Sequence, residues 1–132
     1  MRQINGQALM VRIYIGDADH RDGMPLYQAI VAFLRERGMA GATVLRGIEG
    51  FGANAHLHTT RLLRLSEDLP IVIEVVDEEA RIRAILPELD AMVGDGLITL
   101  EKIEVLAYRA NGTASGGDAG EREPADEAKP PD

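Results

Sequence analysis

A glycine-rich and locally basic segment, residues 49–68, stands out in this chain of 132 residues. Its run EGFGANAHLHTTRLLRLSED is far longer than the roughly two to five residues of a hairpin loop, and long loops in compact domains are often functional. The residues that could hold a ligand are Arg46 just before the segment, Gly50, Phe51 and Gly52 at its start, and Arg61 and Arg64 within it. Glycines let a backbone approach a ligand closely. The segment predicts a site for a small anion; the alternative is a solvated loop whose arginines pair with Glu67 and Asp68.

A second glycine cluster, Gly94-Asp95-Gly96, precedes the last apolar run of the sequence. Successive backbone N–H groups in such a turn can form an anion-binding nest. The same residues would also serve simply to end a helix and begin a strand. Both glycine clusters are therefore candidates for contact with a phosphate group.

His56 and His58 form an H-x-H pair, whose imidazoles point the same way if the segment is a strand. Two ligands are too few for a closed zinc site, so a metal would require several copies of the chain. His56 and His58 are therefore kept as secondary metal candidates. The polar cluster in residues 17–22 lacks the glycine and the distal glutamate of a calcium loop, which favours a polar turn.

Enzymatic motifs are missing from the sequence. It contains no cysteine, no nucleophile elbow, no Walker-type phosphate loop and no H-E-x-x-H motif. Its three histidines fall in expected loops without an evident orienting partner. The sequence favours a binding protein that is not an enzyme and requires no cofactor.

Hydrophobic periodicity predicts the elements that position these residues. Strands are expected over residues 9–15, 42–48, 69–76 and 97–108, the third as a buried central strand. Helices are expected over residues 25–37, ended by Gly38, and 78–93, with Asp77 as N-cap and Pro87 as a kink or short break. The order predicts an α+β, ferredoxin-like βαββαβ sandwich: a four-stranded antiparallel sheet with two helices on one face.

The charge is divided unevenly along the chain. The formal net charge is −8, and residues 110–132 hold six of the 22 acidic residues and two of the 14 basic ones. These residues include no Val, Ile, Leu, Met or aromatic side chain, so we expect a disordered acidic tail. Residues 1–8 are expected to be an N-terminal extension and residues 9–109 the folded domain. The acidic balance argues against a nucleic-acid partner, and the lack of a membrane span or secretory signal predicts a cytoplasmic location.

Several of these motifs together resemble the PII nitrogen-regulatory proteins. They are G-x-x-G-x-T-V at residues 38–44, Gly50-Phe51-Gly52 followed by His56, Leu69-Pro70 at the start of a strand, and Gly94-Asp95-Gly96. The run GATVLRGIEGFGANAHLHT followed by LPIVIEVVD is more similar still to an uncharacterised PII-like family of short prokaryotic proteins. The resemblance covers about residues 8–109.

The resemblance implies a homotrimer with nucleotide bound in clefts between subunits. By position, Thr43 matches a threonine beside the adenine, Gly50 and Gly52 match the base of a long loop near phosphate, and residues 94–96 match a phosphate-cradling turn. The lysine that follows this turn in PII proteins is Leu97 here. The arginines late on the last strand are reduced to Arg109 and Lys102. A nucleotide with fewer phosphates therefore fits at least as well as ATP with magnesium.

The leading hypothesis is a PII-like signalling protein that binds a small phosphate-bearing ligand, an adenine nucleotide (AMP, ADP or ATP), between the subunits of a homotrimer. It would signal to a partner through residues 49–68. Two alternatives stay open. One is a trimeric divalent-metal-binding protein that uses His56 and His58, and the other is a regulatory subunit without ligand that docks on a membrane channel or transporter.

Overall fold

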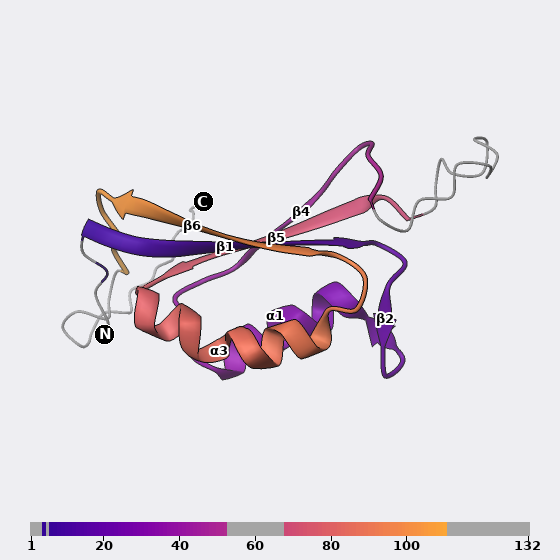
Figure 1. Cartoon of the computed structure of the whole chain (residues 1–132), viewed down its shortest axis with the longest axis horizontal. Coiled ribbons are helices and arrows are strands. Elements are labelled where there is room, and N and C mark those ends of the chain that lie inside the picture. Colours follow the sequence, from indigo (N-terminus) through magenta and orange to yellow (C-terminus); the bar gives the residue numbers. More distant parts are fainter. Residues whose placement is uncertain (1–3, 5, 53–67, 111–132) are drawn as a thin grey trace, which may run out of the picture.

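A computed structural model describes Ile4 and residues 6–52 and 68–110. These residues form a four-stranded antiparallel sheet with two helices packed on one face (Figure 1). The strands are β1 (Gly6–Gly16), β4 (Thr43–Arg46), β5 (Pro70–Asp77) and β6 (Leu97–Val105), and the helices are α1 (Leu26–Glu36) and α3 (Glu79–Met92). The spatial order β4-β5-β1-β6 is that of the ferredoxin-like fold, so the predicted fold class is confirmed.

The alternation of apolar residues in β1 and β5 builds the centre of the core. In β1, every second side chain from Leu9 to Ile15 is buried, and in β5 the same holds from Ile71 to Val75. Both helices cover this face with their apolar stripes. The helical residues of the core are Leu26, Ile30, Leu34, Ile82, Ile85 and Leu89. The sheet is therefore a firm platform, and the candidate site residues lie at its two ends and along its edge strand β4.

The end of α1 follows the predicted signal at Gly38. Gly38 has φ +72°, a conformation that glycine adopts without steric cost. Its N–H donates to the Arg35 carbonyl at 3.0 Å, and the Met39 N–H donates to the Leu34 carbonyl at 3.1 Å. These two bonds are those of a Schellman motif, which turns the chain toward β4.

Several element boundaries differ from the sequence-based expectation. β1 begins at Gly6 rather than residue 9, β4 is limited to Thr43–Arg46, and β6 ends at Val105. A small hairpin, β2 (His20–Arg21) with β3 (Met24–Pro25), fills the connection that was expected to be a polar turn. Most of the long loop (residues 53–67) and most of the expected tail (111–132) lie outside the described residues.

The predicted N-cap of α3 is wrong, and no break occurs at Pro87. The N-cap is Glu78, not Asp77, and it makes no side-chain capping bond; Asp77 is instead the last residue of β5. Pro87 lies inside a continuous helix rather than at a break. It lies on the exposed side of α3, where solvent can reach the Arg83 carbonyl that lacks its usual helical donor.

None of the helices in the described part of the chain is long and apolar enough to cross a membrane.

We expect the ion pair between Arg37 and Glu88 to make stability depend on pH. Arg37 caps α1, and its guanidinium bonds both carboxylate oxygens of Glu88 on α3, with Nη2 2.6 Å from Oε2. This hydrogen bonding lowers the pKa of Glu88 below its ordinary value of 4.5. Since the folded-state pKa lies below the unfolded one, the pair stabilises the fold above about pH 4.5, and this stabilisation is lost as the pH falls through the folded-state pKa.

Urea denaturation at pH 7 and pH 2 checks this dependence. Glu88→Gln should be slightly less stable than the unmodified protein at pH 7 and equal to it at pH 2. Asp90→Asn, which changes a nearby exposed carboxylate on the same helix, is the matched control. A deficit of the same size at both pH values would show that Glu88 acts through packing rather than charge.

Candidate functional site

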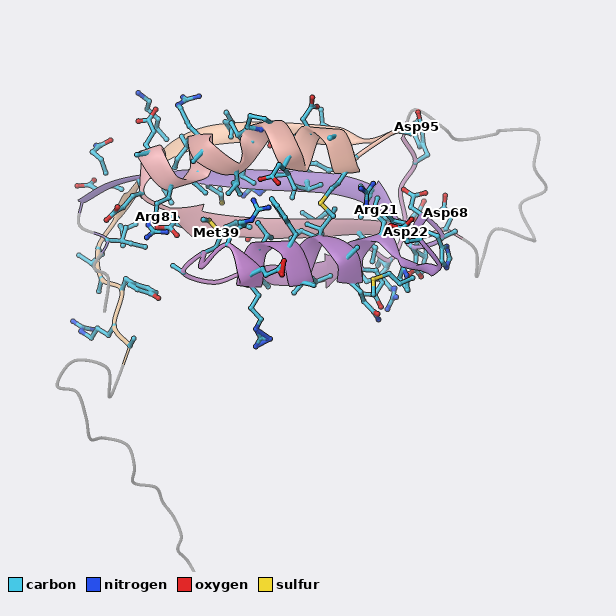
Figure 2. The ribbon with its side chains drawn as sticks, turned by 90° about the horizontal axis from the view of Figure 1, so that it is seen from below. Arg21, Asp22, Met39, Asp68, Arg81 and Asp95 are labelled. Carbon is cyan, nitrogen blue, oxygen red and sulfur yellow. The ribbon has the colours of Figure 1, made fainter. Side chains whose placement is uncertain are left out.

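The candidate residues gather toward the two ends of the sheet. Labelled residues mark these ends in Figure 2: Asp68 and Asp95 lie at one end, and Met39 and Arg81 lie at the other. We call the first the loop end, because β4 finishes there and β5 begins there; the other is the opposite end. The loop end holds Arg46, Gly50, Phe51, Gly52, Gly94, Asp95 and Gly96. Arg109 follows the other end of β6, and Thr43 pairs with Glu74 near the middle of β5.

Residues 94–96 and Arg109 are too far apart within one chain to contact one small ligand. Gly96 precedes β6 and Arg109 follows it. The nine residues of β6 span about 26 Å at roughly 3.3 Å per residue. The resemblance placed both residues around one nucleotide, but a single copy of the chain does not bring them together.

Arg46 is the candidate cation that the structure places at the loop end. It is the last residue of β4, and its side chain is 51% exposed. Its Nη2 donates to Oδ1 of Asp17 at 3.0 Å. This hydrogen bond, followed by the charge of Asp17 and a smaller contribution from Tyr27, raises the pKa of Arg46 further above its ordinary value. A permanently charged guanidinium with one side open to solvent is suited to binding an anion.

Three backbone segments meet at Asp68–Pro70 and form the base of this site. The Asp17 N–H donates to the Leu69 carbonyl at 2.8 Å, and the Gly47 N–H donates to the Pro70 carbonyl at 2.7 Å. The Asp68 carboxylate accepts from the Ala18 N–H at 3.0 Å. Asp68 has φ +39°, which is uncommon for a residue with a side chain. The turn after β1, the end of β4 and the start of β5 are thereby held as one unit.

The glycines of the loop end have different structural needs. A Cβ on Gly96 would lie 2.6 Å from the Tyr14 carbonyl oxygen, whereas a Cβ on Gly94 would meet nothing within 4 Å. A Cβ on Gly50 would lie 3.0 Å from Pro70 Cγ, and one on Gly52 would again meet nothing within 4 Å. Packing therefore explains Gly96 and in part Gly50, while Gly52 and Gly94 are available for close approach of a ligand.

The opposite end is tied together by the segment after β6. The Tyr108 hydroxyl donates to the Ala40 carbonyl at 3.2 Å, so this segment crosses to the loop between α1 and β4. Arg109, exposed beside Tyr108, is thereby brought toward the loop that leads into β4, whose first residue is the exposed Thr43.

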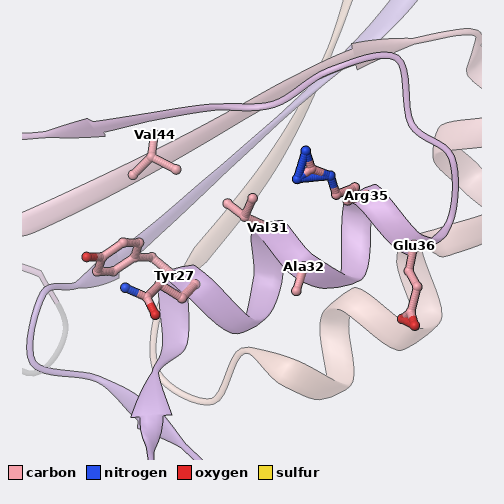
Figure 3. A pocket seen from close by; sticks show the side chains of 7 residues that line it. Tyr27, Val31, Ala32, Arg35, Glu36 and Val44 are labelled. Atoms are coloured by element: carbon pink, nitrogen blue, oxygen red, sulfur yellow. The ribbon is translucent and has the colours of Figure 1, made fainter.

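A groove of about 580 Å³ runs between α1 and the edge strand β4. Tyr27, Val31 and Arg35 rise from the helix toward the strand that carries Val44 (Figure 3). The remaining lining residues are Gln28, Ala32 and Glu36. This groove was not predicted from the sequence. The pattern that could have indicated it is the row Tyr27, Val31 and Arg35, whose members are four residues apart and therefore lie on one side of α1, beside its row of core residues.

The candidate metal ligands His56 and His58 lie outside the described residues, as do Arg61 and Arg64. In the turn after β1, Asp19 accepts from the Gly16 N–H at 3.0 Å, and the His20 ring bonds the Ala18 carbonyl at 2.7 Å. Within residues 6–52 and 68–110, no group of three or more His, Cys, Asp or Glu side chains could hold a metal ion.

Known structures of similar fold include CPII from Thiomonas intermedia K12, a nitrogen regulatory PII-like protein. Its form bound to ADP, AMP and bicarbonate has a TM-score of 0.49 at 18% identity and covers 75% of this chain and 88% of that chain. The form bound to ADP and bicarbonate has a TM-score of 0.46 at 17% identity, with the same coverage.

Sequence comparison gives more similar relatives. A UPF0166 protein of Aquifex aeolicus (strain VF5) is 37% identical over 97 residues, covering 74% of this chain and 91% of that protein. The UPF0166 protein MJ1524 of Methanocaldococcus jannaschii is 35% identical over 100 residues, covering 75% and 92%. The DUF190 family model, described as "Uncharacterized ACR, COG1993", matches residues 8–105. The chain therefore belongs to the DUF190 family, and the prediction that it is a member of an uncharacterised family is confirmed.

Proposed function

We propose that this protein is a PII-like regulatory protein that binds a small anionic ligand, an adenine nucleotide, between the subunits of a homotrimer. The observation that carries the proposal is the division of the candidate residues. One ligand can contact both Arg46 and Arg109 only where the loop end of one copy meets the opposite end of another. A site of this kind is incomplete in a single chain.

The face of the sheet without helices supports such an assembly. The strand register places a set of apolar side chains on this face. They are Met10, Tyr14, Leu45, Val72, Val76 and Leu97. Leu45 and Leu97 are about half exposed, and large apolar surfaces of this kind mark association sites. A second and third copy of the chain are the occupants that we assign to this face.

Charge within the same face is already paired. Arg12 Nε donates to Glu74 Oε2 at 2.9 Å, and its Nη1 lies 3.5 Å from Glu101 Oε1. A paired charge is less costly to bury at an interface than an unpaired one. The face can therefore lose contact with water without leaving Arg12 as an isolated charge.

The start of the long loop supports a signalling role. Ile48 and Phe51 are 93% and 89% exposed, next to the candidate ligand-binding residues Gly50 and Gly52. Apolar side chains on an exposed loop are suited to docking on a protein partner. We propose that nucleotide at the loop end alters this docking, and that residues 49–68 carry the contact with a partner such as a membrane transporter or channel.

Light scattering and calorimetry test the proposal together. The unmodified protein should have three times the chain mass of 14.3 kDa and bind ADP. Leu45→Asp places a carboxylate on the proposed interface, so it should lower the mass and weaken ADP binding by about tenfold or more, equivalent to roughly 1.4 kcal/mol.

Ala84→Asp is the matched control, because it adds the same charge at an exposed position of α3, on the other side of the sheet. It should leave the mass and the ADP affinity close to those of the unmodified protein. A monomeric Leu45→Asp variant that binds ADP normally would contradict the inter-subunit site. Absence of ADP binding by the unmodified trimer would contradict the choice of ligand.

A further inference from the structure

We propose that Asp17 sets the affinity for the ligand, because its carboxylate occupies Arg46 in the free protein and must be displaced by a phosphate group. This inference rests on the proposed function, since it assigns Arg46 to the phosphate of the bound nucleotide. It adds a residue of the turn after β1, outside the motifs that resemble PII proteins. From the sequence alone, Asp17 was predicted only to be part of the polar turn at residues 17–22.

The Asp17 carboxylate is held in place by its own backbone. The Asp17 N–H is bonded to the Leu69 carbonyl at 2.8 Å, and the Asp19 N–H closes the turn onto the Gly16 carbonyl at 3.1 Å. The next N–H, that of Ala18, is bonded to the Asp68 side chain at 3.0 Å. The position of the carboxylate is therefore fixed by a turn that is anchored to the start of β5.

The Arg46 side chain is the movable member of the pair. It is long, and about half of it is exposed, whereas 30% of the Asp17 side chain is exposed. Its backbone is held by the adjacent bond from the Gly47 N–H to the Pro70 carbonyl at 2.7 Å, and besides Asp17 its side chain has a weaker interaction with Tyr27. A guanidinium on a flexible stem can leave the carboxylate and turn toward an incoming anion without any change in β4.

Phosphate is the ligand group that competes best with this carboxylate. A guanidinium presents a planar set of N–H donors that bonds phosphate in a bidentate manner. Arg46 gives Asp17 a single bond, from Nη2 at 3.0 Å. A phosphate near this pair also experiences repulsion from Asp17, so the carboxylate lowers affinity in two ways: it occupies the cation and it repels the anion.

The effect of removing the Asp17 charge follows from the strength of such pairs. Half-exposed ion pairs contribute little, so Asp17→Asn should tighten ADP binding by about two- to fivefold. Adenosine has no phosphate, and its affinity should not change. In an Arg46→Gln background, the Asp17→Asn substitution should give no gain in ADP affinity, because the guanidinium for which Asp17 and phosphate compete is missing.

The matched control is Asp22→Asn in the turn of the β2–β3 hairpin. It removes the same charge from the same connection between β1 and α1, and asparagine tolerates the φ of +51° at this position. Its effect on ADP affinity should be smaller than that of Asp17→Asn. Titration calorimetry at a fixed ionic strength of about 0.15 M keeps screening equal among the variants.

Each outcome of this set of titrations bears on the inference. A gain specific to ADP, to Asp17→Asn and to the presence of Arg46 supports it. Equal ADP affinity of Asp17→Asn and the unmodified protein, an equal gain from Asp22→Asn, or a gain that persists with Arg46→Gln overturns it while leaving the proposed function intact. If neither the unmodified protein nor Asp17→Asn binds ADP, the proposed function itself fails, and the inference fails with it.

Discussion

Gly96→Ala should lower the free energy of unfolding by about 1–3 kcal/mol, the range for side chains forced into filled space. A Cβ at this position would lie 2.6 Å from the Tyr14 carbonyl oxygen, 2.9 Å from Val93 Cγ1 and 3.3 Å from Ile15 Cγ2. The first of these atoms belongs to the backbone of β1, the central strand of the core, and cannot move aside cheaply. Urea denaturation followed by circular dichroism measures the loss.

Gly94→Ala is the matched control for this substitution. A Cβ on Gly94 meets nothing within 4 Å, so the variant should stay within about 0.5 kcal/mol of the unmodified protein. If the turn also cradles phosphate, Gly94→Ala should weaken ADP binding while leaving stability unchanged. If both variants lost stability equally, glycine would be required for the conformation of the turn and not for the close contact with Tyr14.

The fold was predictable from the sequence because periodicity reports burial directly. The alternation from Leu9 to Ile15, the near-continuous apolar run of β5 and the helical spacing of Leu26, Ile30 and Leu34 each describe one face of one element. The end of α1 at Gly38 was likewise predictable, because it depends on local backbone geometry. Such features need no knowledge of distant residues, and the structure confirms them.

The site was less predictable because it depends on contacts between distant segments. The pairing of Arg46 with Asp17 joins residues 29 positions apart, and neither spacing nor composition indicates it. The boundaries of β4 show, in turn, that Thr43 begins and Arg46 ends a short strand. Their partners on β5 are Glu74 and Ile71, so Thr43 lies near the middle of the sheet and Arg46 near its loop end. The hairpin of β2 and β3 has only two residues in each strand, too few for a periodic pattern to emerge.

Asp77 illustrates how tertiary contacts override a local signal. An aspartate before a helix predicts an N-cap, and its Oδ1 does accept from the N–H of the next residue, Glu78, at 2.7 Å. Its Oδ2, however, accepts from the Ala40 N–H at 2.9 Å, across 37 positions in the sequence. The carboxylate is fully buried. It therefore joins the end of β5 to the loop between α1 and β4, rather than capping α3.

Asp77→Ala should consequently destabilise the protein by about 2–4 kcal/mol, since two backbone N–H groups lose a charged acceptor. Asp77→Asn keeps one carbonyl oxygen and should lose less than Asp77→Ala. Asp90→Ala, at an exposed carboxylate on α3, should stay within about 0.5 kcal/mol. Urea denaturation of the three variants at pH 7 gives these differences, and an Asp77→Ala loss as small as that of Asp90→Ala would refute the assignment.

Substitution of Asp77 also bears on ligand binding, because Ala40 connects Asp77 to the segment after β6 at the opposite end of the sheet. The Ala40 N–H is bonded to Asp77, and its carbonyl accepts from the Tyr108 hydroxyl at 3.2 Å. Loss of the Asp77 carboxylate frees the segment that positions Thr43 and Arg109. Asp77→Asn, if it remains folded at 25 °C, should therefore bind ADP more weakly without any change at Arg46. Unchanged ADP affinity in that variant would show that the opposite end is not part of the ligand site.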